Sequence, residues 1–219
     1  KGNSPSRKRQ ALLALSERVD VRAASPAHPA YRLFVTEQQR YEVLRSGTDY
    51  ELRRYPACAI AEVEVEGDFE QAGNMAFRPL VEYIGGANRS SESVAMTAPV
   101  VQSRKLAMTA PVIQATGEAA QQYVVAFVLP ASVSLATAPT PTDPRVRVRE
   151  MPPSLTAVAR YSGRWSQAAY ERHLIDLQAA LAADGLVPIG PPRFARFDPP
   201  FKPWFLRRNE VHLDVREAN

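Results

Sequence analysis

Residues 53–72 read RRYPACAIAEVEVEGDFEQA, and residues 149–168, REMPPSLTAVARYSGRWSQA, repeat their pattern at a constant offset of 96 positions. Both copies run from an extended segment through a glycine into the start of a helix. The repetition of one such unit predicts an internally duplicated domain. The residues that match at this offset are Arg53 and Arg149, Pro56 and Pro152, Ala61 and Ala157, Gly67 and Gly163, Phe69 and Trp165, Gln71 and Gln167, and Ala72 and Ala168.

The elements on either side complete an α+β pattern. Residues 58–66 alternate between small apolar residues and glutamates, which predicts a half-buried strand. Helices are expected near 68–84, with Asp68 as the cap, and over 165–183. We expect the two units to join into a curved antiparallel β-sheet or distorted barrel, flanked by the two helices in a pseudo-twofold arrangement. Further strands are expected at 41–45, 50–55, 94–101, 105–114, 123–129, 145–149, 154–161, 193–197 and 210–215, with a loop over 131–144.

Length and composition limit the possible protein classes. A chain of 219 residues with 45% hydrophobic residues can bury one sizeable core, which excludes disorder for its bulk. No run approaches 18 apolar residues, so no membrane-spanning helix is expected. The single cysteine, Cys58, excludes an internal disulfide framework and favours an intracellular, reducing compartment, with cytoplasm and plastid both open.

The basic charge is concentrated at the start of the chain. Residues 1–10 hold four of the 27 Lys and Arg and no acid, so the rest of the chain carries 23 charges of each sign. A nucleic-acid-binding surface is therefore not expected. We interpret residues 1–40 as an extension that precedes a domain at 41–219. Leu12, Leu13, Leu15 and Val19 give the extension a short amphipathic helix that packs on the domain or on a protein partner.

The usual catalytic spacings are absent from the sequence. His28, His173 and His212 are too few for a dense metal cluster, and structural roles are the better interpretation for each. An enzyme acting on a planar molecule would have Cys58, His173 and Glu82 as its candidates, and none has a visible catalytic partner. We therefore consider an enzyme less plausible than a binding protein.

Two segments have the composition of a binding surface for a flat apolar molecule. The first helix places Asn74, Phe77 and Val81 at i, i+3 and i+7. Residues 197–205, FDPPFKPWF, combine four aromatic residues with three prolines and Lys202, which suits an apolar wall with one cation for a carboxylate. A loop that merely packs over the sheet is an equally reasonable interpretation. The repeated AMTAPV segments at 95–100 and 107–112 are interpreted as adjacent strands whose methionines fill the core, and the alternative is that these methionines line a site for a flat apolar ligand.

Several motifs resemble the SOUL/heme-binding protein family over residues 41–216. They are YELRRYP at 50–56, YIGGAN at 83–88, the two AMTAPV segments, DPPFKP at 198–203 and RNEV at 208–211. The resemblance implies the duplicated fold that the repeat predicts independently. It also implies tetrapyrrole binding in a groove beside the first helix and under the late proline-rich loop.

The resemblance also implies which residues border that groove. Arg54 stands where some members carry an iron-ligating histidine, and Glu82 occupies the helix face. We therefore expect weak binding of heme or a related porphyrin, without an axial ligand, by a noncatalytic carrier or buffer. The alternative is an interaction subunit that uses the fold without a ligand. The expected binding residues are Asn74, Phe77, Arg78, Val81, Phe201, Lys202 and Trp204.

Overall fold

A computed structural model describes residues 37–89, 104–117, 121–199 and 201–217. The expected extension at 1–40 lies almost entirely outside these residues, as do the expected strand at 94–101 and the first AMTAPV segment. The described elements are β1 (Glu37–Gln38), β2 (Glu42–Ser46), β3 (Glu51–Tyr55), β4 (Cys58–Glu66), α1 (Phe69–Ile84), β5 (Asn88–Arg89), β6 (Thr109–Ala110), β7 (Val112–Thr116), β8 (Gln122–Val128), β9 (Thr140–Pro141), β10 (Arg147–Met151), β11 (Ser154–Tyr161), α2 (Gln167–Ala183), β12 (Leu186–Arg196), the short 3-10 helix η1 (Trp204–Leu206) and β13 (Asn209–Glu217).

The main sheet has nine strands in the order β10-β4-β8-β7-β12-β13-β11-β3-β2. All neighbouring strands in this sheet pair antiparallel. Along the chain, β3 belongs to the first half and β10 to the second. In the sheet, β3 pairs with β11 of the second half, and β10 pairs with β4 of the first. Each half therefore gives the first strand of its repeat unit, β3 or β10, to the other half.

The strand registers follow the repeat. Tyr55 pairs with Ser154 at one end of the sheet, and Met151 pairs with Cys58 at the other, which is the same pair after the 96-residue offset. The two halves meet where Gln114 of β7 pairs with Phe194 of β12. The predicted pseudo-twofold arrangement is thus present in the register of the hydrogen-bonded sheet.

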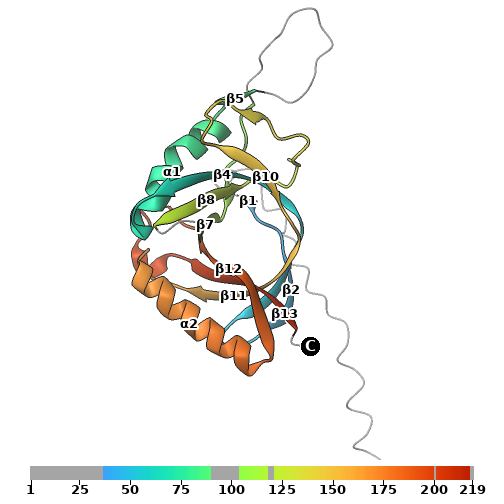
Figure 1. Cartoon of the computed structure of the whole chain (residues 1–219), viewed down its shortest axis with the longest axis vertical. Helices are drawn as coiled ribbons and strands as arrows, with labels where there is room; N and C mark the ends of the chain where they lie inside the picture. The colour runs from blue at the N-terminus through green and yellow to red at the C-terminus, as the bar shows by residue number, and fades with distance from the viewer. Residues whose placement is uncertain (1–36, 90–103, 118–120, 200, 218–219) are drawn as a thin grey trace, which may run out of the picture. The chain divides into compact units, whose positions relative to one another are not determined.

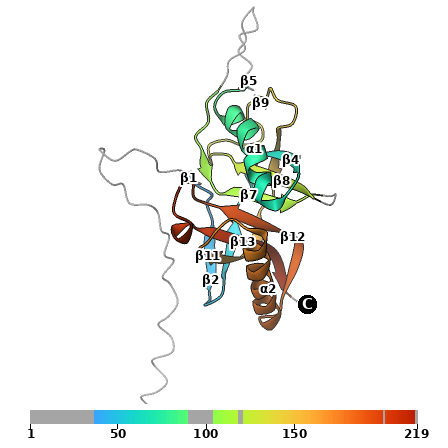
Figure 2. The same ribbon diagram turned by 90° about the vertical axis from the view of Figure 1, so that its left-hand side faces the viewer.

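Both helices lie on the outer side of the curved sheet (Figure 1). Helix α1 covers β4 and β8, and α2 covers β11, β12 and β13 (Figure 2). Each helix buries one apolar core against its half of the sheet. In the first half, Ala59, Ala61 and Val63 of β4 face α1, as the alternation predicts. The second core gathers around Phe194 and Leu177. A smaller apolar cluster on the opposite face of the sheet contains Ile60 and Ile113.

Equivalent glycines make the turns that lead to the helices. Gly67 and Gly163 have φ angles of 144° and 149°, in the region that favours glycine. Ser166 caps α2 by accepting a hydrogen bond from the backbone N–H of Ala169. Asp68 occupies the N-cap of α1, but its side chain makes no capping hydrogen bond, so the predicted role of that side chain is wrong.

Several details differ from the sequence-based expectations. The described sheet is open, with β10 and β2 at its two edges, so it is curved without closing into a barrel. Strand β12 is longer than expected, and the loop at 131–144 contains the short strand β9. Glu62 is buried rather than solvated, because Arg149 of the neighbouring β10 donates to it at 2.8 Å. Within the described residues, no helix is both long and apolar enough to cross a membrane.

Candidate functional site

The outer face of α1 exposes an aromatic ring. Phe77 is 45% exposed, and the exposed Asn74 precedes it by one turn. The ring of Phe77 also packs edge-on against the buried Phe127, with centroids 5.9 Å apart. Val81 is half-buried against the core of the first half. This face thus offers a fixed apolar surface with a polar residue beside it.

The charged residues on the same helix neutralise each other. Arg78 donates from Nε to the Glu82 carboxylate at 2.9 Å, one turn further on. The guanidinium is almost fully exposed, so this pair contributes little to stability. An anionic ligand would have to compete with Glu82 for Arg78.

The proline-rich loop, residues 197–199 and 201–206, presents apolar side chains to solvent. Phe201 is 87% exposed and Trp204 is 49% exposed, with Phe205 and Leu206 exposed beside them. The Trp204 and Phe205 rings meet edge to face at 5.6 Å, and the Arg164 guanidinium lies 5.7 Å from the Trp204 centroid. Contiguous exposed apolar residues of this kind mark interaction surfaces.

Lys202 has a carboxylate partner within the same loop. Its Nζ donates to Asp198 at 2.6 Å. Burial alone would raise the pKa of Asp198, but the Arg208 backbone N–H and Lys202 outweigh it and lower that pKa. The Lys202 side chain is still about one-third exposed, and an ammonium has three donors, so it can share the remaining ones with a ligand.

Arg196 connects α1 to the proline-rich loop. Its Nη1 lies 2.5 Å from the position that a Cβ on Gly73 would occupy, and Phe77 follows Gly73 by one turn. Its guanidinium carbon also lies 5.0 Å from the centroid of the Trp165 ring. Arg207 contacts the same indole at 4.4 Å and donates from Nε to the carbonyl of Lys202 at 2.8 Å.

A continuous line of contacts thus runs from the first helix to the loop, although no ring contact joins Phe77 to Trp204 among the described residues. Arg196 was not predicted from the sequence. Its signal was the alternation of RFARF at 193–197, which places Arg196 on the same face as the core residue Phe194.

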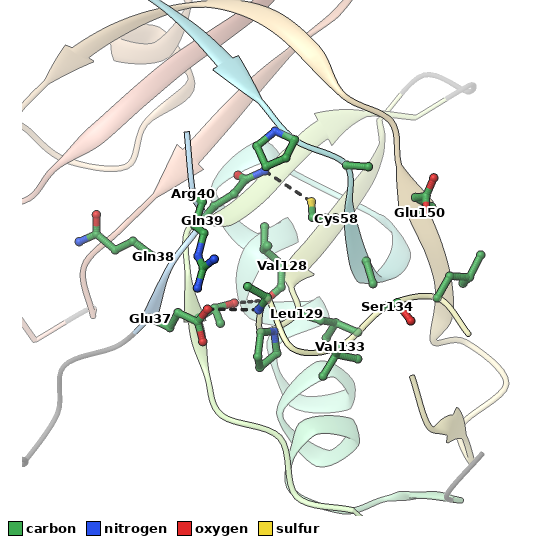
Figure 3. Close-up of a pocket in the computed structure, with 17 residues that line it drawn as sticks. Glu37, Gln38, Gln39, Arg40, Cys58, Val128, Leu129, Val133, Ser134 and Glu150 are labelled. Carbon is green, nitrogen blue, oxygen red and sulfur yellow. Dashed lines mark hydrogen bonds between the residues drawn. The ribbon is translucent and has the colours of Figure 1, made fainter. Parts of the chain in front are cut away.

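A separate pocket of about 300 Å³ lies at the start of β4, beside Cys58 (Figure 3). Cys58 lines it, and Gln39 Nε2 donates to the Cys58 Sγ at 3.5 Å. Burial raises the pKa of this thiol, which disfavours the reactive thiolate. Glu37 and Glu150 are further polar residues of the lining. None of the sequence-predicted binding residues lines this pocket.

The candidate catalytic residues are dispersed. His173 stacks on Tyr161 with ring centroids 4.0 Å apart, and burial lowers the pKa of the imidazole. His212 is buried on β13 and hydrogen-bonds to Glu210 at 2.8 Å. In the part of the chain that the structure describes, no three His, Cys, Asp or Glu side chains gather as a metal site. Arg54 is exposed and pairs with Glu42 at 2.8 Å.

The sequence is similar to known proteins over most of the chain. The family model described as SOUL heme-binding protein matches residues 36–214. Heme-binding protein 1 of Xenopus tropicalis is 28% identical over 168 residues, which cover 76% of this chain and 84% of that protein. Heme-binding protein 1 of Xenopus laevis is 26% identical over the same shares.

Solved structures match the fold at low identity. The EcmrR C-terminal domain has a TM-score of 0.56 at 11% identity, covering 77% of this chain and 99% of its own. A hydrolase from Listeria innocua has a TM-score of 0.50 at 12% identity, covering 79% and 94%. At these identities the likeness concerns the fold alone.

Proposed function

The chain belongs to the SOUL heme-binding protein family, and from that membership we propose that it binds a tetrapyrrole, heme or a related porphyrin, without catalysing a reaction on it. A carrier or buffer is the role that fits such binding. The site proposed for the ligand is the surface from the Phe77 face of α1 to the proline-rich loop.

The observation that carries this proposal is the exposed aromatic loop surrounded by cations. A porphyrin is a flat apolar ring whose propionates are anionic. Trp204 and Phe201 offer apolar area for the ring, while Lys202 and Arg164 lie close enough to meet carboxylates. Hydrogen bonds between such charged partners are shorter and stronger than neutral ones. The residues present therefore suit the ligand's chemistry.

Binding should depend on burial of the ring rather than on coordination of iron. Arg54, at the position where some members carry a histidine, stays protonated and is paired with Glu42. Bound heme would supply an iron centre, while the protein's own residues would orient the ring and hold its propionates. We expect a dissociation constant on the order of micromolar or weaker. Metal-free protoporphyrin should bind about as well as hemin.

The proposal is tested by titrating hemin and metal-free protoporphyrin into the wild type, Phe77→Asp and Lys202→Glu. Phe77→Asp puts a charge on the apolar face, and Lys202→Glu reverses the loop cation, so both should weaken both ligands. The exposed substitution Ile175→Asp, on the outer face of α2, serves as the control. A hemin-only response with a six-coordinate low-spin spectrum would overturn the mechanism without an axial ligand.

Absence of binding by either ligand would instead favour the second role, an interaction subunit that has kept the fold and works through a protein partner, with residues 1–40 as the proposed contact. We also propose an intracellular, reducing compartment, in the cytoplasm or a plastid, because the sequence has one cysteine and Cys58 is a free thiol.

A further inference from the structure

Arg196 differs from Arg53, the other buried arginine of the described residues, and from the partly buried Arg193 and Arg208. Arg53, Arg193 and Arg208 each form an ion pair with a carboxylate. Arg196 is only 7% exposed, yet it forms no ion pair within the described residues. Its Nη2 donates to the amide oxygen of Gln114 at 2.8 Å, and its Nε has no hydrogen-bond partner there. Burying a cation without a counter-ion or a full set of hydrogen-bond acceptors costs free energy, unless a further acceptor pairs with it.

Two more donors without partners lie around the same side chain. The indole Nε1 of Trp165 and the hydroxyl of Tyr161 are buried and make no hydrogen bond within the described residues. The guanidinium of Arg196 contacts the Trp165 ring, and it lies 5.0 Å from the centroid of Phe194, against which Tyr161 stacks at 6.4 Å. Buried polar groups are almost always satisfied, so three neighbouring donors without acceptors indicate a missing acceptor.

The local charge is positive. The guanidinium of Arg207 lies 4.4 Å from the Trp165 centroid, so two cations share one indole. Glu70 is near enough to attract the Arg196 charge electrostatically. Its carboxylate, however, accepts a hydrogen bond from the backbone N–H of Gln167 at 3.0 Å and forms no ion pair with Arg196. Burial lowers the pKa of Arg196 to about 10, against a partial opposing effect of Tyr161 and Glu70, so the side chain is still protonated at neutral pH.

Gly73 brings this cation to the surface of α1. A side chain at position 73 would collide with the guanidinium, because its Cβ would lie 2.5 Å from Nη1 and 3.2 Å from Cζ. The absence of a side chain therefore lets Arg196 reach the helix, one turn before the exposed Phe77. A flat ligand on the Phe77 face would have its edge next to this arginine.

From this arrangement we infer that Arg196 binds a carboxylate of the ligand, so the protein selects porphyrins whose propionates are free over those whose propionates are esterified. The inference rests on the proposed function. A guanidinium offers a planar fork that suits a carboxylate, and it would supply the acceptor that the buried donors lack.

The test compares deuteroporphyrin with its dimethyl ester, titrated by fluorescence in one buffer with the same mild detergent. The wild type should bind the free acid at least about tenfold more tightly, since a hydrogen bond to a charged group is worth roughly 1.5–3 kcal/mol and 1.4 kcal/mol is a factor of ten. In Arg196→Met the affinity for the acid should fall towards that for the ester, leaving only the preference that Lys202 contributes, while the ester's affinity stays unchanged. Arg216→Met, on the exposed end of β13, should behave as the wild type.

Gly73→Ala provides a second variant that keeps every charge. The methyl group should push the guanidinium away from α1 and reduce the preference for the free acid. Thermal unfolding without ligand separates a structural role from a binding role. Arg196→Met should unfold at the same or a higher temperature than the wild type, because an apolar side chain replaces an unpaired buried charge.

The outcomes distinguish this inference from the proposed function. If the wild type binds neither porphyrin, the proposed function fails and the inference fails with it. If the wild type binds both but Arg196→Met keeps the wild-type ratio of acid to ester affinity, the inference alone is overturned. A lower unfolding temperature of Arg196→Met with an unchanged ratio would assign Arg196 a structural role.

Discussion

At the scale of single residues, the most heavily committed charge is Glu210. Its carboxylate is fully buried and accepts hydrogen bonds from Arg53 at 3.0 Å, Arg208 at 2.6 Å and His212 at 2.8 Å. Burial alone would raise the pKa of Glu210, but His212 and the two arginines outweigh it and hold that pKa far below the usual 4.5. Because the carboxylate stays ionised, it can only accept, and His212 must carry its proton on Nε2.

Glu210→Gln should therefore destabilise the protein strongly. It removes the buried carboxylate that Arg53 and Arg208 share and leaves Arg53 only the more exposed Glu51, at 2.7 Å. A buried ion pair that loses one partner costs about 3–5 kcal/mol. Urea denaturation at pH 7 measures this loss, with the exposed Glu217→Gln as the control. A change of less than about 1 kcal/mol would contradict the account.

The same change should alter the pH dependence of stability. A group whose pKa is lowered on folding contributes stability above its unfolded pKa, and this contribution is lost as the pH falls below that value. The gap between wild type and Glu210→Gln should thus be full at pH 7 and narrow as the pH falls below about 4.5. A gap that stays constant down to pH 3 would show that Glu210 does not titrate in this way.

The sequence could not reveal this cluster. Alternation along residues 210–215 places Glu210 and His212 on one face, but their partner Arg53 comes from a strand 157 residues earlier. The same limit applies to the proposed ligand surface. Phe77 and Lys202 could be selected from composition and helical spacing, whereas the contacts of Arg196 with Trp165 and Gly73 depend on the packing of three separate elements.

At the scale of elements, the sequence predicts most of the structure. Both helices and the strands β4, β8 and β11 occur near their expected positions, because alternation, glycine breaks and helical periodicity are local signals. The order of strands in the sheet was not predicted. The exchange of β3 and β10 between the halves depends on long-range pairing. The pattern of residues within a strand does not specify which strand it pairs with.

Gly163 gives a direct test of the repeated turn. Its φ of 149° is unfavourable for any side chain, while no atom lies within 4 Å of a Cβ built there, so Gly163→Ala isolates the backbone cost. We expect a loss of about 1–3 kcal/mol in the free energy of unfolding. Gly185→Asn is the matched control, because φ of 69° lies in the left-handed region that Asn tolerates. Equal losses for the two variants would contradict this reasoning.

At the scale of the whole domain, the exchanged strands should join the two halves into one cooperative unit. Neither half keeps the first strand of its own repeat unit, since β3 pairs with β11 of the second half and β10 pairs with β4 of the first. The halves also pair directly along β7 and β12. A substitution that destabilises one core should therefore lower the stability of the other, and unfolding should follow a single two-state transition.

Leu80→Ala tests this coupling, because the chain places both of its tryptophans, Trp165 and Trp204, in the second half. Leu80 is fully buried in the core of the first half, so the truncation should cost about 2–5 kcal/mol. If the halves unfold together, the midpoint of the tryptophan fluorescence transition in urea should shift as far as the midpoint followed by far-UV circular dichroism, with the slope m unchanged. The exposed Ile175→Ala should shift neither probe. A fluorescence midpoint that stays at the wild-type value while the dichroism midpoint falls would mean that the second half unfolds on its own, and that the exchanged strands do not couple the two cores.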